Sequence, residues 1–450
     1  MTSGWAVRGA ALHTPAPGTV EAWDDVLIEI DPVGRIAGVH AQAPPALAAR
    51  YGVAGRLTLL GPRQLLLPGL VDLHVHAPQF PNLGTALDVP LERWLQEYTF
   101  PLEARYADVE FATGVYERLV ATLLANGTTT AVYYATLHLP ATQRLAEICL
   151  KHGQRAFVGR VAMDHPEQCP TYYRDASTAS AVGETGALIE AVRALPGNAG
   201  LVRPIVTPRF IPACTDELLA GLGALAAETG CAVQTHCSES DWEHGHVLGR
   251  CGCTDTEALH GFGLLTPHAV LAHGNFVGDA DLARIRDAGA GIAHCPLSNV
   301  YFAGAVLPLR AALEKGVRVG LGTDISGGAQ PSLLESARMA VTLSRALETG
   351  VDPSLPAATR GRPRSRIDTM AAFWLATVGG AEVLGQPTGL FRPGYAFDAL
   401  LLDADRPDSN LHLDPAEAAA RRLERIVHTA GRPNIVATWV DGRLVHGRAG

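Results

Sequence analysis

The stretch Pro68-Gly-Leu-Val-Asp-Leu-His-Val-His76 is an apolar strand that ends in two histidines. Alternate residues of a strand face the same side, so His74 and His76 are expected to point in one direction. This is the first of eight short apolar stretches that alternate with helical segments, the pattern of a parallel α/β architecture. Eight strand–helix units make a closed barrel, so we predict an α/β fold, a (β/α)8 TIM-like barrel with both imidazoles inside. The predicted strands cover residues 70–77, 128–135, 155–163, 202–209, 232–239, 269–275, 291–296 and 317–324.

Both ends of the chain differ in sequence pattern from the middle, because they contain short apolar runs broken by proline and glycine. Such runs are typical of antiparallel strands joined by turns, and Asp441-Gly442 is a hairpin signal. We therefore predict that residues 1–66 and 387–450 form one small β-sandwich domain. Residues 67–386 form the barrel domain in this prediction.

The composition limits the classes of partner. The chain of 450 residues is 47% hydrophobic and carries a net charge of −9. An acidic chain without a strong basic patch is not expected to bind nucleic acid. No apolar run reaches the ~18 residues of a membrane span, and the first dozen residues lack the apolar core of a signal peptide. The eight cysteines are therefore expected to be free thiols in the cytoplasm.

Polar residues stand at the ends of several predicted strands, where the active site of such a barrel lies. His74 and His76 end the first strand, His236 lies near the end of the fifth, and Asp324 ends the eighth. Three imidazoles and one carboxylate suit one divalent metal, with zinc preferred and ferrous iron as the alternative. One coordination position should stay open for water, whose pKa a bound cation lowers to about 7.

A single buried histidine on a strand is more often a core residue than a ligand. Four such groups at the functional end of one barrel are a different case, because their chance placement there is improbable. His294 ends the seventh strand and either contacts substrate or shapes the rim. The pair His244 and His246 follows the fifth strand and is not expected in the site. Cys251-Gly-Cys253 is too tightly spaced for a zinc knuckle.

These residues resemble the amidohydrolase superfamily, through the stretch that ends in His76, through His236 and His273, and through Gly322-Thr-Asp324. The resemblance implies a barrel with a small β-sandwich. Binuclear members bridge two metals with a carbamylated lysine at the end of strand four. This chain has only Lys151 and Lys315, and neither lies there, so a mononuclear site is expected. His236-Cys-Ser-Glu239 fits the branch that contains purine and pyrimidine deaminases.

Within this branch the chain is similar to the guanine deaminases. The segments that carry the likeness are His76-Ala-Pro-Gln79, Trp94-Leu-Gln-Glu-Tyr-Thr-Phe-Pro101, Asn126-Gly-Thr-Thr-Thr130, Val206-Thr-Pro-Arg-Phe210, Ala293-His-Cys-Pro296 with Ser298-Asn299, and Leu321-Gly-Thr-Asp324. The chain departs from the pattern at Leu297, where family members often carry a polar residue. The likeness implies metal ligands at His74, His76, His236 and Asp324.

The likeness also implies that Gln79, Arg209 and Phe210 hold the purine, with further contacts from His236, Glu239 and Asp324. A carboxamide and a guanidinium can bond the edge of a heterocycle, and an aromatic ring can stack on it. Arg209 could instead pair with a surface acid, and Phe210 could pack in the core. The segment that contains Trp94 either covers the site as a lid or packs against the barrel.

The implied reaction is hydrolysis of guanine to xanthine and ammonia by a metal-activated water. Glu239 is expected to shuttle a proton, Asp324 to accept one from water, and His273 to polarise the attacking oxygen. Alternatives on the same scaffold are deaminases of 8-oxoguanine, adenosine-type or cytosine substrates, and triazine deaminases or chlorohydrolases. A non-catalytic barrel should lack the ligand set. The H-x-E/P-C-x-x-C deaminase design is absent from the sequence. A homodimer is expected.

Overall fold

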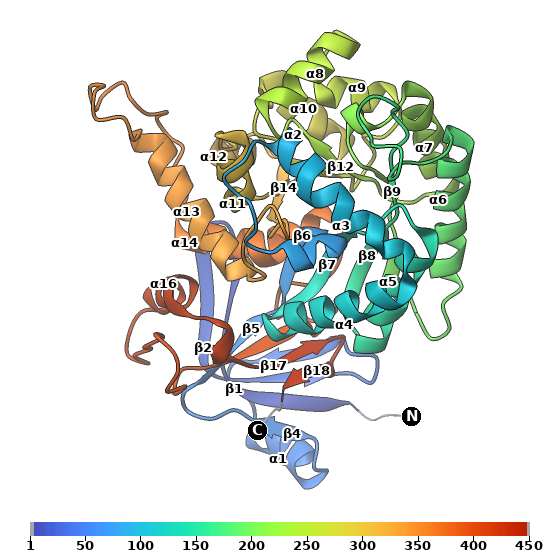
Figure 1. Cartoon of the computed structure of the whole chain (residues 1–450). Coiled ribbons are helices and arrows are strands. Elements are labelled where there is room, and N and C mark those ends of the chain that lie inside the picture. The colour runs from blue at the N-terminus through green and yellow to red at the C-terminus, as the bar shows by residue number, and fades with distance from the viewer. Residues whose placement is uncertain (1–3, 448–450) are drawn as a thin grey trace.

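The computed structural model describes residues 4–447 and contains all eight predicted barrel strands (Figure 1). The strands are β6 (Leu70–His76), β7 (Thr128–Tyr134), β8 (Arg155–Gly159), β9 (Val161–Ala162), β10 (Val202–Pro204), β11 (Thr207–Pro208), β12 (Gln234–Cys237), β13 (Val270–His273), β14 (Gly291–His294) and β15 (Arg318–Leu321). The third predicted strand is divided into β8 and β9, and the fourth into β10 and β11. Pro204 and Pro208 have no backbone N–H to donate, which limits the ladder in the fourth.

Backbone hydrogen bonds join the strands into a ring. One arc has the order β10-β8-β7-β6, and the other has the order β12-β13-β14-β15. The arcs meet at Val206, whose N–H donates to the carbonyl of Ala232 at 3.0 Å. They meet again where the Asp324 N–H donates to the carbonyl of His74 at 2.8 Å and the His76 N–H donates to Ile325 at 2.9 Å. This second seam closes the barrel at the ends that carry the polar residues.

Helices cover the outside of the barrel (Figure 1). The larger ones are α4 (Val109–Ala125), α5 (Leu139–His152), α6 (Thr178–Arg193), α7 (Asp216–Thr229), α8 (Asp241–Cys251), α9 (Asp255–Gly261), α10 (Asp279–Ala288), α12 (Leu309–Glu314), α13 (Leu333–Thr349) and α14 (Thr369–Trp374). The residues at which these helices begin and end follow local sequence signals. In α7 the Thr215 side chain accepts the Leu218 N–H, and Gly230 ends the helix in the left-handed conformation.

Shorter helices lie at the ends of the barrel strands or between the longer ones. They are η1 (Ala77–Asn82), α2 (Leu91–Trp94), η2 (Leu95–Thr99), α3 (Phe100–Ala104), η3 (Arg105–Ala107), η4 (Ile211–Ala213), α11 (Pro296–Ser298), η5 (Asn299–Ala303), η6 (Leu375–Gly379) and α15 (Gly380–Val383). The run from η1 to η3 follows β6, the strand that carries His74 and His76. It therefore lies where it can cover the polar end of the barrel.

Strands from both ends of the chain form one eight-stranded sheet below the barrel (Figure 1). Its strands are β1 (Trp5–Ala16), β2 (Thr19–Ile30), β3 (Ile36–His40), β4 (Leu57–Leu59), β5 (Gln64–Pro68), β16 (Ala399–Asp403), β17 (Ile435–Val440) and β18 (Arg443–Gly447). The helices α1 (Pro45–Val53) and α16 (Ala419–Thr429) and the single turn η7 (Arg432–Asn434) accompany it. The sheet order is β18-β17-β16-β5-β1-β2-β3, and the eighth strand, β4, pairs with β1. The C-terminal strand β16 therefore pairs directly with the N-terminal strand β5.

The eight strands belong to one hydrogen-bonded sheet, and its division from the barrel at residues 66 and 387 stays a prediction. β5 runs across the first of these boundaries and leads through Gly69 into β6. A side chain at Gly69 would lie 2.2 Å from the Thr129 hydroxyl oxygen, so only glycine allows this close passage.

A buried ion pair links the sheet to the barrel. Arg155 at the start of β8 donates to both carboxylate oxygens of Asp398, each at 3.2 Å, and to Asp441 at 2.8 Å. Asp398 is fully buried and also accepts the Thr388 hydroxyl at 2.9 Å. The pair therefore fixes the first residues of a barrel strand to the C-terminal part of the sheet.

The sequence predicts that the chain has no membrane-spanning helix and that its cysteines are free thiols. Between residues 4 and 447, no helix combines the length and apolar character of a membrane span. All eight cysteines are free thiols, and six of them are buried.

Candidate active site

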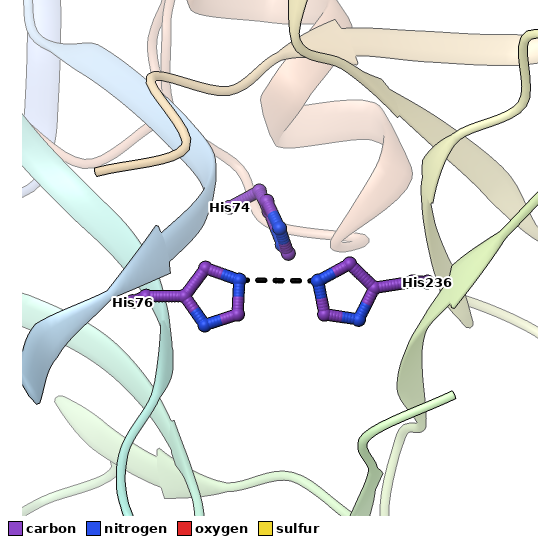
Figure 2. A group of neighbouring side chains, drawn as sticks. All are labelled: His74, His76 and His236. Carbon is purple, nitrogen blue, oxygen red and sulfur yellow. Dashed lines mark hydrogen bonds between the residues drawn. The ribbon is translucent and has the colours of Figure 1, made fainter. Parts of the chain in front are cut away.

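Three imidazoles from two strands converge inside the barrel (Figure 2). His74 and His76 come from β6, and His236 comes from β12 on the other side of the barrel. The Nε2 atoms of His76 and His236 lie 3.1 Å apart. Asp324 follows β15, and its Oδ1 lies 3.2 Å from Nε2 of His74 and 3.5 Å from Nε2 of His76. The four predicted ligands are therefore in one group.

The hydrogen bonds of this group fit a metal ion. Both ring nitrogens of His74 and Nδ1 of His76 are buried without a hydrogen-bond partner. Buried polar atoms nearly always have one. Of these nitrogens, Nε2 of His74 faces Asp324 within the group, so it is the one left for a ligand there. His236 donates from Nδ1 to the carbonyl of Arg209 at 2.6 Å. This bond leaves the lone pair of its Nε2 facing the group, as a metal ligand requires.

The pKa shifts of the three histidines and Asp324 agree with metal binding. Burial lowers the pKa of His74, His76 and His236 well below the usual range, which keeps the rings neutral. Neutral imidazoles are the form that binds metal. Burial also raises the pKa of Asp324 to about 6. Three imidazoles and one carboxylate form a donor set suited to zinc or ferrous iron.

Two further residues, Glu239 and His273, lie beside the four predicted metal ligands. Burial, and then the charge of Asp324, raise the pKa of Glu239 well above its usual value. Nε2 of His273 lies 3.7 Å from Oε1 of Glu239 and 4.0 Å from Oδ2 of Asp324. Nδ1 of His273 donates to Oδ1 of Asn299 at 2.9 Å, so Nε2 carries the lone pair. The site thus places a carboxyl group with a raised pKa beside an imidazole nitrogen that can accept a hydrogen bond.

The backbone at this end of the barrel is strained. His273 has a φ of 73° and Asp324 a φ of 50°, both in the left-handed region that side chains other than glycine rarely adopt. Each such residue costs on the order of 1–3 kcal/mol, and such strain concentrates at functional sites. The fold therefore holds these two side chains in place at a cost in stability.

A pocket opens beside the imidazoles and the two carboxyl groups. Its wall includes the three residues predicted to hold a purine, Gln79, Arg209 and Phe210. The remaining wall residues are His76, Leu91, Trp94, Leu95, His236, Glu239, Ser298, Phe302, Asp324 and Gly327. Trp94 from α2 and Phe302 from η5 meet over the pocket, with ring centroids 5.0 Å apart. The segment with Trp94 thus forms part of the pocket wall.

The other histidines singled out in the sequence lie outside the pocket wall. His294 is buried, and burial lowers its pKa to about 3. His244 lies 3.3 Å from the carboxylate of Asp255. His246 packs near Trp242, with ring centroids 6.1 Å apart. None of the three reaches the group around Asp324 or lines the pocket.

Three carboxyl groups that hold the site together were not predicted from the sequence. Glu103 in α3 bonds both Gln79 and Arg209. Asp72 accepts the N–H of Thr323 at 2.9 Å and its hydroxyl at 2.6 Å, which ties the two strand ends together. Glu243 accepts the Glu239 N–H at 2.6 Å. Asp72 could have been singled out from the sequence, because it is an acidic residue inside an apolar strand.

A sequence model of the amidohydrolase family matches residues 65–445. The chain belongs to the amidohydrolase family. The match runs through the barrel of this amidohydrolase and the C-terminal strands of its sheet, and it includes every residue of the group around Asp324.

Individual relatives are similar over nearly the whole chain. A probable guanine deaminase of Schizosaccharomyces pombe is 37% identical over 449 residues, which cover 98% of this amidohydrolase and 83% of the relative. The guanine deaminase of Homo sapiens is 34% identical, over 97% of this chain and 96% of its own. A crystal structure of guanine deaminase from C. acetobutylicum with bound guanine in the active site has a TM-score of 0.86 and 31% identity, covering 98% of this chain and 100% of that one.

Proposed function

We propose that this amidohydrolase deaminates guanine, with water, to xanthine and ammonia. One observation carries the proposal: a single pocket joins Glu239 and Asp324 to the predicted purine contacts Gln79, Arg209 and Phe210. The whole-length similarity to guanine deaminases supports the same substrate.

We propose that His74, His76, His236 and Asp324 hold one divalent cation, with zinc first and iron second. Neither lysine of the chain supports a second metal. Lys151 pairs with Glu117 on the barrel exterior, and Lys315 pairs with Asp279. When bound, such a cation lowers the pKa of a coordinated water from about 16 to about 7.

The pocket residues bind and orient the ring. Gln79 and Arg209 offer N–H donors to its carbonyl edge, and Phe210 packs against its face. The neighbouring carbon C2, which N1 alone separates from C6, then lies with its 2-amino group toward Glu239 and Asp324. Trp94 and Phe302 exclude bulk water from the covered site, which strengthens each of these polar contacts.

The reaction forms a C2–O bond and breaks the C2–N bond, and the protein moves the protons. Glu239 donates its proton to a ring nitrogen while Asp324 takes one from the attacking water. The lone pair on Nε2 of His273 accepts a hydrogen bond from the attacking oxygen. Glu239 then takes a proton from this oxygen and delivers it to the leaving amine. The proton held by Asp324 passes to Glu239, so both carboxyl groups return to their starting states. A carboxyl group with a raised pKa suits both directions of transfer.

The direct test is an ammonia-release assay over guanine, 8-oxoguanine, adenine, adenosine, cytosine and aminated triazines, with and without a chelator. We expect turnover with guanine that the chelator abolishes and added zinc restores. Faster turnover of another ring would contradict the choice of guanine. Turnover that survives complete metal removal would contradict the role of the ligand set.

We further propose a cytoplasmic homodimer. The eight free thiols favour a reducing compartment. Analytical ultracentrifugation tests the subunit number, and a monomer at micromolar concentration contradicts this part of the proposal.

A further inference from the structure

Glu103 is a buried carboxylate that no step of the proposed reaction uses. It lies in α3, shortly after the residues of α2 and η2 that line the pocket, and it is 0% exposed. Its Oε2 accepts NH1 of Arg209 at 2.7 Å, and its Oε1 accepts NH2 of Arg209 at 3.2 Å and Nε2 of Gln79 at 2.8 Å. One carboxylate thus bonds both polar side chains proposed to hold the ring.

These bonds fix which way the Gln79 amide points. Its Nε2 donates to Glu103, and its Oε1 accepts the Ser326 N–H at 3.2 Å. A reversed amide would place an oxygen against the carboxylate and an N–H against the Ser326 N–H, so both contacts would become repulsive. Gln79 therefore keeps one amide N–H free for a ligand.

Glu103 also determines the charge of this end of the pocket. Arg209 is 2% exposed, and a buried guanidinium without a partner would carry a large desolvation penalty. The bidentate pair with Glu103 cancels this charge but leaves other N–H groups of Arg209 free. This end of the pocket therefore offers donors with no net charge, which suits a neutral ring rather than an anion.

We infer that Glu103 is a specificity-determining residue that selects a purine with a carbonyl oxygen, rather than an amino group, at position 6. The inference rests on the proposed function. A carbonyl accepts the donors of Gln79 and Arg209, whereas an amino group at that position would leave donors facing donors. A site built to bond one polar group rejects an analogue without it by about 10⁴–10⁵-fold.

The test compares guanine with 2,6-diaminopurine, which carries an amino group in place of the carbonyl at position 6. We expect the wild type to favour guanine in kcat/KM by about 10⁴-fold. Glu103→Gln replaces an acceptor oxygen with a donor of similar shape and frees the orientation of Gln79. We expect the preference to fall by about 10- to 100-fold, mainly through a higher KM for guanine. The preference is a ratio within one preparation, so a smaller folded fraction does not change it.

Asp398→Asn is the matched control, because it weakens a buried Arg–carboxylate pair outside the pocket. It should lower thermal stability and keep the wild-type preference. If Glu103→Gln does not fold, Gln79→Met removes the oriented donor while the Arg209 pair stays, and it should also lower the preference.

The outcomes separate the two proposals. A wild type that releases ammonia from neither ring overturns the proposed function and this inference with it. A wild type that favours guanine, with an unchanged preference in the Glu103→Gln or the fallback variant, overturns the inference alone. A wild type that deaminates both rings equally also overturns only the inference.

Discussion

Buried histidines occur in both parts of the molecule, but their surroundings differ. In the terminal sheet, His13 is 3% exposed, and both of its ring nitrogens are bonded. Nε2 pairs with Glu21 at 2.9 Å, and Nδ1 accepts the Phe391 N–H at 3.1 Å. In the barrel, His74 is equally buried, and neither of its nitrogens has a partner. Burial alone therefore does not identify a ligand. An unsatisfied buried nitrogen indicates one only where other ligand groups lie beside it, as at His74 but not at His294.

The largest expected effect comes from removing the ring of His74, whose nitrogens have no hydrogen-bond partner. His74→Ala should lose the metal and lower deamination by at least about 10⁴-fold, because water without a cation returns to a pKa of about 16. His13→Phe should keep both the metal and the activity. Metal analysis and ammonia release measure the two effects. Wild-type metal content in His74→Ala would show that the unsatisfied nitrogens are not ligands.

A second change separates proton transfer from metal binding within the barrel. Glu239→Gln should keep the metal and lower kcat by about 10²–10⁴-fold, the usual loss for a positioned acid–base group. The matched variant Glu243→Gln changes a carboxyl group that holds only the Glu239 backbone, so its loss of kcat should be smaller. Wild-type turnover in Glu239→Gln would remove this residue from the mechanism.

The third prediction concerns stability. Zinc at about 1,000 times its Kd should stabilise the metal-free protein by about 4 kcal/mol, because it binds the folded state alone. Urea unfolding with and without zinc measures this gain. His13→Phe should show the same gain, and His74→Ala should show little of it. An equal gain in His74→Ala would indicate binding at another place.

The smallest expected effect is a pH-dependent change in the free energy of unfolding when His13 in the terminal sheet is replaced. Burial lowers the pKa of His13, so its neutral form contributes stability above an unfolded pKa of about 6.5, and this contribution is lost as the pH falls. At pH 8, His13→Phe should cost about 1–3 kcal/mol, because it leaves the Phe391 N–H unpaired. The difference from wild type should narrow toward pH 5. A constant difference in urea unfolding across this range would contradict the pH dependence assigned to His13.

Much of this arrangement could be predicted from the sequence because it depends on local patterns. Short apolar stretches that alternate with helical segments identified all eight barrel strands. Polar residues at several strand ends then predicted that His236 and Asp324 meet at one end of the barrel. The partners of Arg209 could not be predicted in this way. Glu103 lies just beyond the segment around Trp94, for which the sequence left a lid and plain packing open. Its burial depends on contact with Arg209, more than one hundred positions away. The run of β5 across the predicted domain boundary also depends on pairing with the distant strand β16.

The seam at which Asp324 and Ile325 bond to His74 and His76 also sets the moment at which the site can form during protein synthesis. The ribosome makes β6 early and the stretch after β15 late, so a nascent chain carries two of the imidazoles long before the carboxylate that faces them. A chain that stops before Ile325 cannot close this ring. The proposed metal site can therefore be completed only after the last barrel strand has left the exit tunnel.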